Sequence, residues 1–216
     1  MFLTRKAQLV APEQTLPGRS ERRFELADKH VVLGTPVVTD EVPDGYEVAL
    51  FGLGCFWGAE EIYWQVPGVW STSVGYAGGT TPNPSYEEVC SGATNHTEAV
   101  RIVFDPRQVS YADLVKTFFE VHDPTQGFRQ GNDVGTQYRS AIYWTTPEQE
   151  QVARELTAVY GAELERRRPG AIPTEIRPAP DPPYFSPADH HHPYLPTPPF
   201  GYRCHANTGV KFPDIS

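Results

Sequence analysis

Short apolar runs of strand length alternate along the middle of the chain with segments of helical periodicity. Strands are expected over residues 47–53, 69–76, 99–104 and 138–144, where apolar runs or alternating patterns lie between turn residues, and residues 174–176 are a candidate for a last strand. Helices are expected over about 57–65, 85–90, 110–121 and 146–167. Because this order lacks the long regular alternation of a doubly wound sheet, it predicts an α+β fold with helices packed on one side of a sheet.

Three of these helices begin with residues that cap a helix N-terminus. Ser85 and Glu88 have the spacing of a capping box, in which the serine hydroxyl and the glutamate carboxylate satisfy backbone N–H groups. Ser110 opens the next helix, and Thr146 precedes a proline at the first helical position. Each cap therefore predicts where its helix begins.

The two ends of the chain carry no comparable pattern. Residues 1–45 are polar and interrupted by prolines, and residues 179–216 are rich in proline and contain three consecutive histidines. The segment 125–137 is also polar and is expected to be a loop. We therefore expect one domain over residues 1–216, with an N-terminal arm (1–45), an α+β core (46–178) and a C-terminal coil (179–216).

Composition excludes several functions. The chain of 216 residues has 27 acidic and 18 basic residues, a formal net charge of −9, and no long basic block. Nucleic acid and anionic membranes are therefore not expected as partners. No apolar stretch is long enough to span a membrane, and the first residues do not form a signal peptide. The expected location is a reducing cytoplasm.

The three cysteines point to chemistry more than to architecture. Cys55, Cys90 and Cys204 are widely spaced, include no CxxC pair, and are too few for a disulfide framework. Cys90 is expected to pack as an inert side chain on a short helix. Cys204 lies in a Pro- and Gly-rich tail, and a single cysteine in such a tail suits a resolving thiol that approaches another cysteine.

Cys55 stands at the most informative position. The run Gly52-Leu53-Gly54-Cys55-Phe56-Trp57-Gly58 joins an expected buried strand to an expected helix. A thiol beside the first N–H groups of a helix has a lowered pKa and a larger thiolate fraction. The alternative is a buried cysteine that acts as a small hydrophobic side chain.

Further candidates lie in the segments after this helix. Glu98 begins an apolar strand, where partial burial would raise its pKa and make it a proton donor; the alternative is a solvated glutamate. Tyr86 and Tyr138 can supply phenolic donors, or can be packed aromatics with hydrated hydroxyls. Asp133, by default, is a turn residue.

Histidines near the C-terminus do not predict a metal site. His190, His191 and His192 are adjacent in a proline-rich segment and lack an acid or thiol at a spacing typical of metal ligands. We expect neither a metal nor a cofactor, and the three histidines have no assigned role.

An ordered set of motifs resembles the class A peptide methionine sulfoxide reductases. The set extends over about residues 45–205, and the N-terminal Leu16-Pro17-Gly18-Arg19 is also similar to longer members. The motifs are Gly54-Cys55-Phe56-Trp57-Gly58, Gly75-Tyr76-Ala77-Gly78-Gly79, Pro82-Asn83-Pro84-Ser85-Tyr86-Glu87-Glu88-Val89-Cys90, His96-Thr97-Glu98-Ala99-Val100, His122-Asp123-Pro124, Gly131-Asn132-Asp133-Val134-Gly135-Thr136-Gln137-Tyr138-Arg139-Ser140 and Gly201-Tyr202.

The resemblance implies a function and a fold. The substrate would be methionine S-sulfoxide, free or in oxidised proteins, and the fold a two-layer α+β sandwich with a mixed sheet and a ferredoxin-like core. The enzyme would repair proteins after oxidative damage. A thioredoxin-type dithiol would be its reductant.

The resemblance also implies roles for single residues. Cys55 would attack the sulfoxide sulfur and become a sulfenic acid, which Cys204 would convert to a disulfide. Glu98 would protonate the sulfoxide oxygen. The remaining site residues would donate hydrogen bonds to that oxygen (Tyr86 and Tyr138), line the methyl pocket (Phe56 and Trp57) or join the polar network (Asp133).

The tail departs from the family pattern in three places. Arg203 stands between Tyr202 and Cys204, where members often have the cysteine directly after Gly-Tyr, and Lys211 follows Gly209-Val210, where some carry a second cysteine. Residues 189–195 have histidine and proline in place of glutamines. Cys204 is therefore the expected resolving cysteine, and a two-step thiol relay is not expected.

Two other functions remain as alternatives at this point. Cys55 and a histidine would form an acyl-transfer pair in an enzyme of another class. A protein without catalysis would bind methionine sulfoxide or sense redox state.

Overall fold

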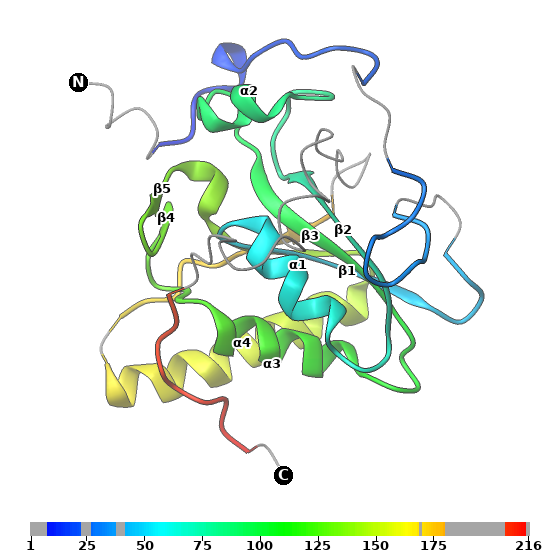
Figure 1. Ribbon diagram of the computed structural model, residues 1–216. Coiled ribbons are helices and arrows are strands. Elements are labelled where there is room, and N and C mark those ends of the chain that lie inside the picture. Colours follow the sequence, from blue (N-terminus) through cyan, green and yellow to red (C-terminus); the bar gives the residue numbers. More distant parts are fainter. Residues whose placement is uncertain (1–7, 23–26, 38–41, 169, 180–205, 215–216) are drawn as a thin grey trace.

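The computed structural model describes residues 8–22, 27–37, 42–168, 170–179 and 206–214. Their main feature is a five-stranded mixed sheet, in the order β2-β3-β1-β6-β7 (Figure 1). The pairs β2–β3, β1–β3 and β1–β6 are antiparallel, and β6–β7 is parallel. The strands are β1 (Glu47–Leu53), β2 (Val69–Ala77), β3 (Thr97–Phe104), β6 (Ser140–Trp144) and β7 (Glu175–Pro178).

Three helices pack against the same face of this sheet (Figure 1). They are α1 (Phe56–Trp64), α3 (Tyr111–Val121) and α4 (Pro147–Arg167), while the short α2 is Tyr86–Cys90. Because side chains alternate along a strand, Phe51 and Ile102 pack beneath these helices, whereas Leu50 and Tyr143 belong to a second, smaller cluster. The larger cluster holds the main core of the protein.

The caps expected from the sequence are present. Ser85 accepts a hydrogen bond from the backbone N–H of Glu88, and the Glu88 carboxylate accepts one from Ser85, which completes the capping box of α2. The side chain of Ser110 accepts a hydrogen bond from the backbone N–H of Asp113 in α3, and that of Thr146 accepts one from the backbone N–H of Gln149 in α4. The expected starts of these three helices are therefore confirmed.

The segment 125–137 was expected to be a loop, and this prediction was wrong in part. It contains a two-stranded hairpin, β4 (Arg129–Gln130) with β5 (Asp133–Val134), and the start of a 3-10 helix at Thr136–Tyr138. Tyr138 therefore ends that helix and is not in β6, which begins at Ser140. Two-residue strands have no detectable apolar periodicity, because the pattern needs about four residues to be recognised.

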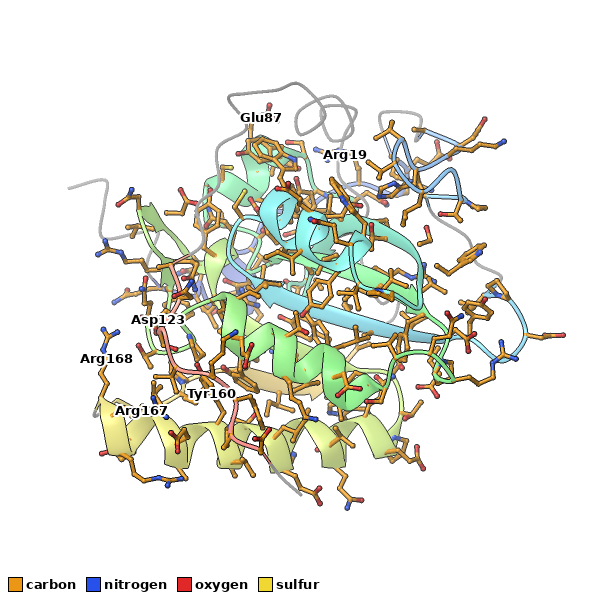
Figure 2. The ribbon with its side chains drawn as sticks, turned by 60° about the horizontal axis from the view of Figure 1, so that its bottom comes forward. Arg19, Glu87, Asp123, Tyr160, Arg167 and Arg168 are labelled. Carbon is orange, nitrogen blue, oxygen red and sulfur yellow. The ribbon has the colours of Figure 1, made fainter. Side chains whose placement is uncertain are left out.

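The N-terminal arm lies against the core through polar contacts. Arg19 donates a hydrogen bond to the carbonyl of Asn83 and forms an ion pair (2.6 Å) with Glu88 of α2. Figure 2 labels Arg19 and Glu87, the residue before Glu88 in the chain. His30 is 1% exposed, and its Nε2 lies 2.9 Å from the Thr72 hydroxyl on β2. The arm therefore contributes buried contacts beyond the surface packing expected from the sequence.

The end of the chain is also anchored. The Tyr160 hydroxyl on α4 donates to the carbonyl of Val210 (3.1 Å), and Phe212 stacks on the Tyr160 ring (Figure 2 labels Tyr160). Glu120 on α3 accepts from the backbone N–H of Phe212. Residues 206–214 are thus held to α3 and α4.

None of the helices within the described ranges has the length and apolar character needed to cross a membrane.

Candidate functional site

The turn between β1 and α1 holds Cys55 at the N-cap of the helix. Cys55 has extended-type dihedrals (φ −57°, ψ 119°), is 6% exposed, and directly precedes the first helical residue, Phe56. Gly54 has a φ of +103°, and a Cβ at this position would lie 2.6 Å from Cγ of Gln130. Only glycine fits this turn without strain, so the turn presents the thiol at the positive end of the helix dipole.

Glu98 is the acid beside this turn. Its carboxylate Oε2 accepts a hydrogen bond from the backbone N–H of Phe56 (3.0 Å), and the residue is 2% exposed. Burial raises the pKa of Glu98 well above its usual value of 4.5, and the neighbouring Cys55 and Asp133 raise it further, while the Phe56 hydrogen bond opposes the rise. The alternative of a solvated glutamate is therefore wrong.

Tyr86 and Tyr138 approach Glu98 from two different elements, near enough for its charge to affect the pKa of each. Tyr86 is the first residue of α2, and Tyr138 ends the 3-10 helix before β6. Burial raises the pKa of both phenols, and the charge of Glu98 raises each pKa further. Both hydroxyls therefore stay protonated near neutral pH and can act as hydrogen-bond donors near Glu98.

Phe56 and Trp57 form an aromatic wall on the first turn of α1. Their ring centroids are 5.8 Å apart, and the Phe56 ring lies at the same distance from the ring of Tyr76. Asp133, partly exposed on β5, contributes to the raised pKa of Glu98 and of Tyr138. The structure thus brings Asp133 to the polar side of the site, where the sequence by default indicated a turn residue.

Gln130 is a residue that sequence reasoning missed. It is 1% exposed and packs against Gly54. Its side-chain amide accepts a hydrogen bond from the backbone N–H of Asp123 (3.2 Å) and donates one to the Asp123 carbonyl (3.1 Å). Figure 2 shows Asp123 beside α4, where its carboxylate lies 3.5 Å from Arg168. No periodicity marks a buried glutamine in a polar segment, so only the fold identifies this support of the Cys55 turn.

Cys90 and Tyr76 also belong to the surroundings of the site. Cys90, expected to be inert, is hydrogen-bonded to the side chain of Tyr86 and is one of the groups that raise the pKa of that phenol. Tyr76 pairs across the sheet with Glu98. The sequence contained Tyr76 in a recognised motif but gave no signal that it would face the acid.

His96 and His122 have other contacts at both ring nitrogens. His96 binds the carbonyl of Thr81 (2.8 Å) and accepts from the backbone N–H of Gly79. The ring nitrogens of His122 bind the Phe118 carbonyl and the Ser140 hydroxyl. These contacts weaken the alternative of an acyl-transfer pair.

The remaining sequence candidates lie outside the described residues. These are Cys204 and the histidines 190–192. Within the part of the chain that the structure describes, no three His, Cys, Asp or Glu side chains converge in a way that could hold a metal ion.

Comparison with known proteins gives one consistent result. A family model described as peptide methionine sulfoxide reductase matches residues 47–215. The chain is 55% identical to the peptide methionine sulfoxide reductase MsrA of Salinispora arenicola, over 99% of this chain and 96% of that protein. It is 52% identical to MsrA 1 of a Synechocystis species, over 97% and 92% of the two chains.

Solved structures agree with the sequence comparison. Methionine sulfoxide reductase A of Corynebacterium diphtheriae has a TM-score of 0.83 and 46% identity, and the match covers 96% of this chain and all of that one. Reduced Mxr1 of Saccharomyces cerevisiae has a TM-score of 0.68 and 28% identity over 79% of this chain and 98% of its own. The turn of Cys55, the buried acid and both comparisons agree: the chain belongs to the peptide methionine sulfoxide reductase family.

Proposed function

We propose that this protein reduces methionine S-sulfoxide, free and in oxidised proteins, to methionine. One observation carries the proposal: Glu98, an acid with a raised pKa, is hydrogen-bonded to the first backbone N–H of the helix that begins after Cys55. A sulfoxide oxygen is a poor leaving group unless it is protonated, so the reaction needs a carboxylic acid that keeps its proton near neutral pH.

In the first step the Cys55 thiolate attacks the sulfoxide sulfur while Glu98 gives its proton to the oxygen. The S–O bond breaks, the oxygen is transferred to Cys55, and methionine leaves. The methionine sulfur gains two electrons, and Cys55 loses two and becomes a sulfenic acid. The thiolate, the sulfoxide and one proton thus account for both products.

The other site residues orient the substrate. Tyr86 and Tyr138 donate hydrogen bonds to the sulfoxide oxygen as negative charge develops on it. Phe56 and Trp57 line a pocket for the methyl group, since aromatic rings make favourable contacts with polarised sulfur. Asp133 is part of the polar network, where its charge favours the protonated form of Glu98.

In the second step Cys204 resolves the sulfenic acid on Cys55. Its thiol attacks the Cys55 sulfenic acid, which forms the Cys55–Cys204 disulfide and releases water. A thioredoxin-type dithiol then reduces this disulfide and becomes oxidised itself. The proposed role is repair of oxidised proteins in a reducing cytoplasm.

The architecture proposed for this activity is a single domain with a two-layer α+β sandwich. The order β1-α1-β2-β3-α3-β6, with antiparallel neighbours β2-β3-β1-β6, supports a ferredoxin-like core. The arm at 1–45 and the coil at 179–216 extend from the core at 46–178.

The decisive experiment uses both epimers of methionine sulfoxide with three forms of the full chain. Wild type is expected to consume the S epimer repeatedly with thioredoxin, its reductase and NADPH. Cys55→Ser is expected to abolish turnover. Cys204→Ser is expected to release about one methionine per protein with thioredoxin and to recycle with dithiothreitol, which reduces the sulfenic acid directly.

Each rival function gives a different result in this assay. Undiminished multiple turnover of Cys204→Ser with thioredoxin would reject Cys204 as the resolving cysteine. A trapped thioester on Cys55, with no disulfide formed under sulfoxide, would favour acyl transfer. Binding of sulfoxide by wild type with no methionine released would favour a sensing or binding protein.

A further inference from the structure

Tyr76 carries a buried hydroxyl without an evident structural use. The residue is fully buried in β2, and its hydroxyl has no hydrogen-bond partner among the residues that the structure describes. Leaving such a group unpaired costs free energy, so native proteins retain few of them, and each needs an explanation. A hydroxyl that is unpaired in the resting protein can be paired at another stage of the reaction.

The position of Tyr76 identifies the partner. Tyr76 and Glu98 are directly opposite on β2 and β3, so their side chains leave the same face of the sheet. The Tyr76 ring packs on Phe56 with centroids 5.8 Å apart. Burial raises the pKa of Tyr76, and the nearby Glu98, Cys90 and Tyr86 raise it further. The hydroxyl therefore remains protonated, and the register of the strands places Tyr76 beside Glu98 on the same face of the sheet.

The reaction creates a need for one more donor at this place. In the resting site Glu98 accepts a hydrogen bond from the Phe56 N–H and is 2% exposed. When its proton passes to the sulfoxide oxygen, a negative carboxylate is left in a buried position, which is costly without further hydrogen bonds. Tyr86 and Tyr138 are then engaged with the oxygen, in the function proposed above.

We propose that Tyr76 is a positioning residue for Glu98, whose hydroxyl donates a hydrogen bond to the Glu98 carboxylate formed by proton transfer. The inference rests on the proposed function, because it requires Glu98 to act as the acid. The proton that Glu98 loses goes to the oxygen, and Tyr76 keeps its own proton. Tyr76 thereby stabilises the state in which the S–O bond breaks and leaves the protonated resting state unchanged.

Tyr111 offers a matched control. Its hydroxyl, on α3, is buried and also lacks a partner among the described residues, and its ring packs against Phe51 in the core (6.0 Å). Burial is the cause of its raised pKa, with no contribution from a residue of the site. Tyr111→Phe therefore removes the same kind of atom from the same core without a link to Glu98.

The experiment compares the two phenylalanine variants in the full chain, with methionine S-sulfoxide as substrate and dithiothreitol as reductant. Both variants should unfold at or above the wild-type temperature, because each loses an unpaired buried hydroxyl. Tyr76→Phe should lower kcat about ten- to hundred-fold, the range of a hydrogen bond to a charged group. Tyr111→Phe should keep the wild-type rate.

The pH profile separates this role from a structural one. Without the Tyr76 donor the carboxylate form of Glu98 is less stable, so Glu98 keeps its proton to higher pH. The alkaline limb of kcat/KM should therefore move to higher pH in Tyr76→Phe even though the rate is lower. In a Glu98→Gln background, Tyr76→Phe should cause no further loss of the residual rate.

If the wild-type enzyme is active, two results would reject this inference and leave the proposed function intact. One is a Tyr76→Phe variant with wild-type kcat and pH profile; the other is an equal fold-loss with and without Glu98. A wild-type protein that releases no methionine from the sulfoxide would reject the proposed function, and this inference with it.

Discussion

At the scale of single residues, the buried acid is the most consequential group of the site. Burial makes Glu98 hold its proton, and it also makes the folded state sensitive to pH. Below pH 4.5, the usual pKa, the carboxyl is protonated in both folded and unfolded chains, and its contribution to stability is fully present. As pH rises, the unfolded chain ionises first, and stability is lost until the pH passes the raised pKa of the folded state.

Glu98→Gln should remove this loss, because the amide does not titrate. The free energy of unfolding of the variant relative to wild type should increase from about pH 4.5 upward, by at most about 1.4 kcal/mol for each pH unit. Its sulfoxide turnover should fall about 10²- to 10⁴-fold, the usual contribution of a general acid. Urea unfolding at pH 4.5 and pH 8 measures the first effect.

An exposed glutamate supplies the comparison for this measurement. Glu148 is exposed on α4, so Glu148→Gln should not reproduce the gain in stability of Glu98→Gln and should keep the wild-type activity. If the stability difference between Glu98→Gln and wild type stayed constant from pH 4.5 to 8, the buried carboxyl would not have the raised pKa described above.

At the scale of elements, the turn from β1 to α1 decides where the thiol stands. Gly54→Ala adds a Cβ at a φ of +103° and brings it 2.6 Å from the Gln130 side chain. The variant should lose about 1–3 kcal/mol of unfolding free energy through backbone strain and a further part through displacement of Gln130. Because Cys55 and the Phe56 N–H move with the turn, sulfoxide turnover should fall at least about tenfold.

Gly45 separates the two contributions. It also has a positive φ (+80°), but a Cβ there would meet no heavy atom within 4 Å. Gly45→Ala should therefore show the strain alone, with full activity. Equal losses of stability and equal activities in the two variants, measured by urea unfolding and turnover, would exclude a role for the Gly54–Gln130 contact.

At the scale of the whole molecule, one buried guanidinium connects segments far apart in the sequence. Arg139 is 5% exposed and donates to the carboxylate of Glu175 on β7 (2.8 Å), to the carbonyl of Thr136 (2.9 Å) and to that of Asn95 (3.1 Å). It directly follows Tyr138 in the chain. The cluster thus fixes the segment of Tyr138 against β7 and the loop before β3.

Glu175→Gln tests this connection. Burial acts to raise the pKa of Glu175, but the charges and hydrogen bonds of Arg139 and, to a smaller extent, Arg177 outweigh it and lower the pKa below 4.5. This contribution is present above pH 4.5 and is lost as pH falls through the lowered pKa. The variant should lose about 3 kcal/mol of unfolding free energy at pH 7, since it leaves a buried charge unpaired, and the difference from wild type should shrink in acid.

The exposed pair of Glu150 and Arg154 on α4 is the control for this loss. Their charged groups are 2.7 Å apart with side chains 33% and 57% exposed, so Glu150→Gln should cost at most about 1 kcal/mol. Similar losses for the two variants at pH 7 would mean that Arg139 does not depend on Glu175.

The elements that sequence patterns predicted well are those with local signals. Short apolar runs and alternating patterns marked the main sheet strands, and Ser85, Ser110 and Thr146 marked three helix starts that the structure confirms. The hairpin at 129–134 was missed, because its strands have two residues each. Tyr138 ends a 3-10 helix of only three residues, which is also too short to recognise from periodicity, and the sequence pattern placed it in the strand that follows.

Cys55 illustrates what the sequence by itself determined. Its turn, the glycine before it and the helix after it are neighbours in the chain, so local chemistry was enough to suggest a reactive thiol beside the alternative of a packed core cysteine, and the ordered motifs were enough to indicate the family. The tertiary structure decided the rest. Burial of Glu98, its position at the Phe56 N–H and its pairing with Tyr76 depend on strands that are far apart in the sequence. Desolvation and convergence arise only when those strands pack, because they are properties of the folded core and not of any segment.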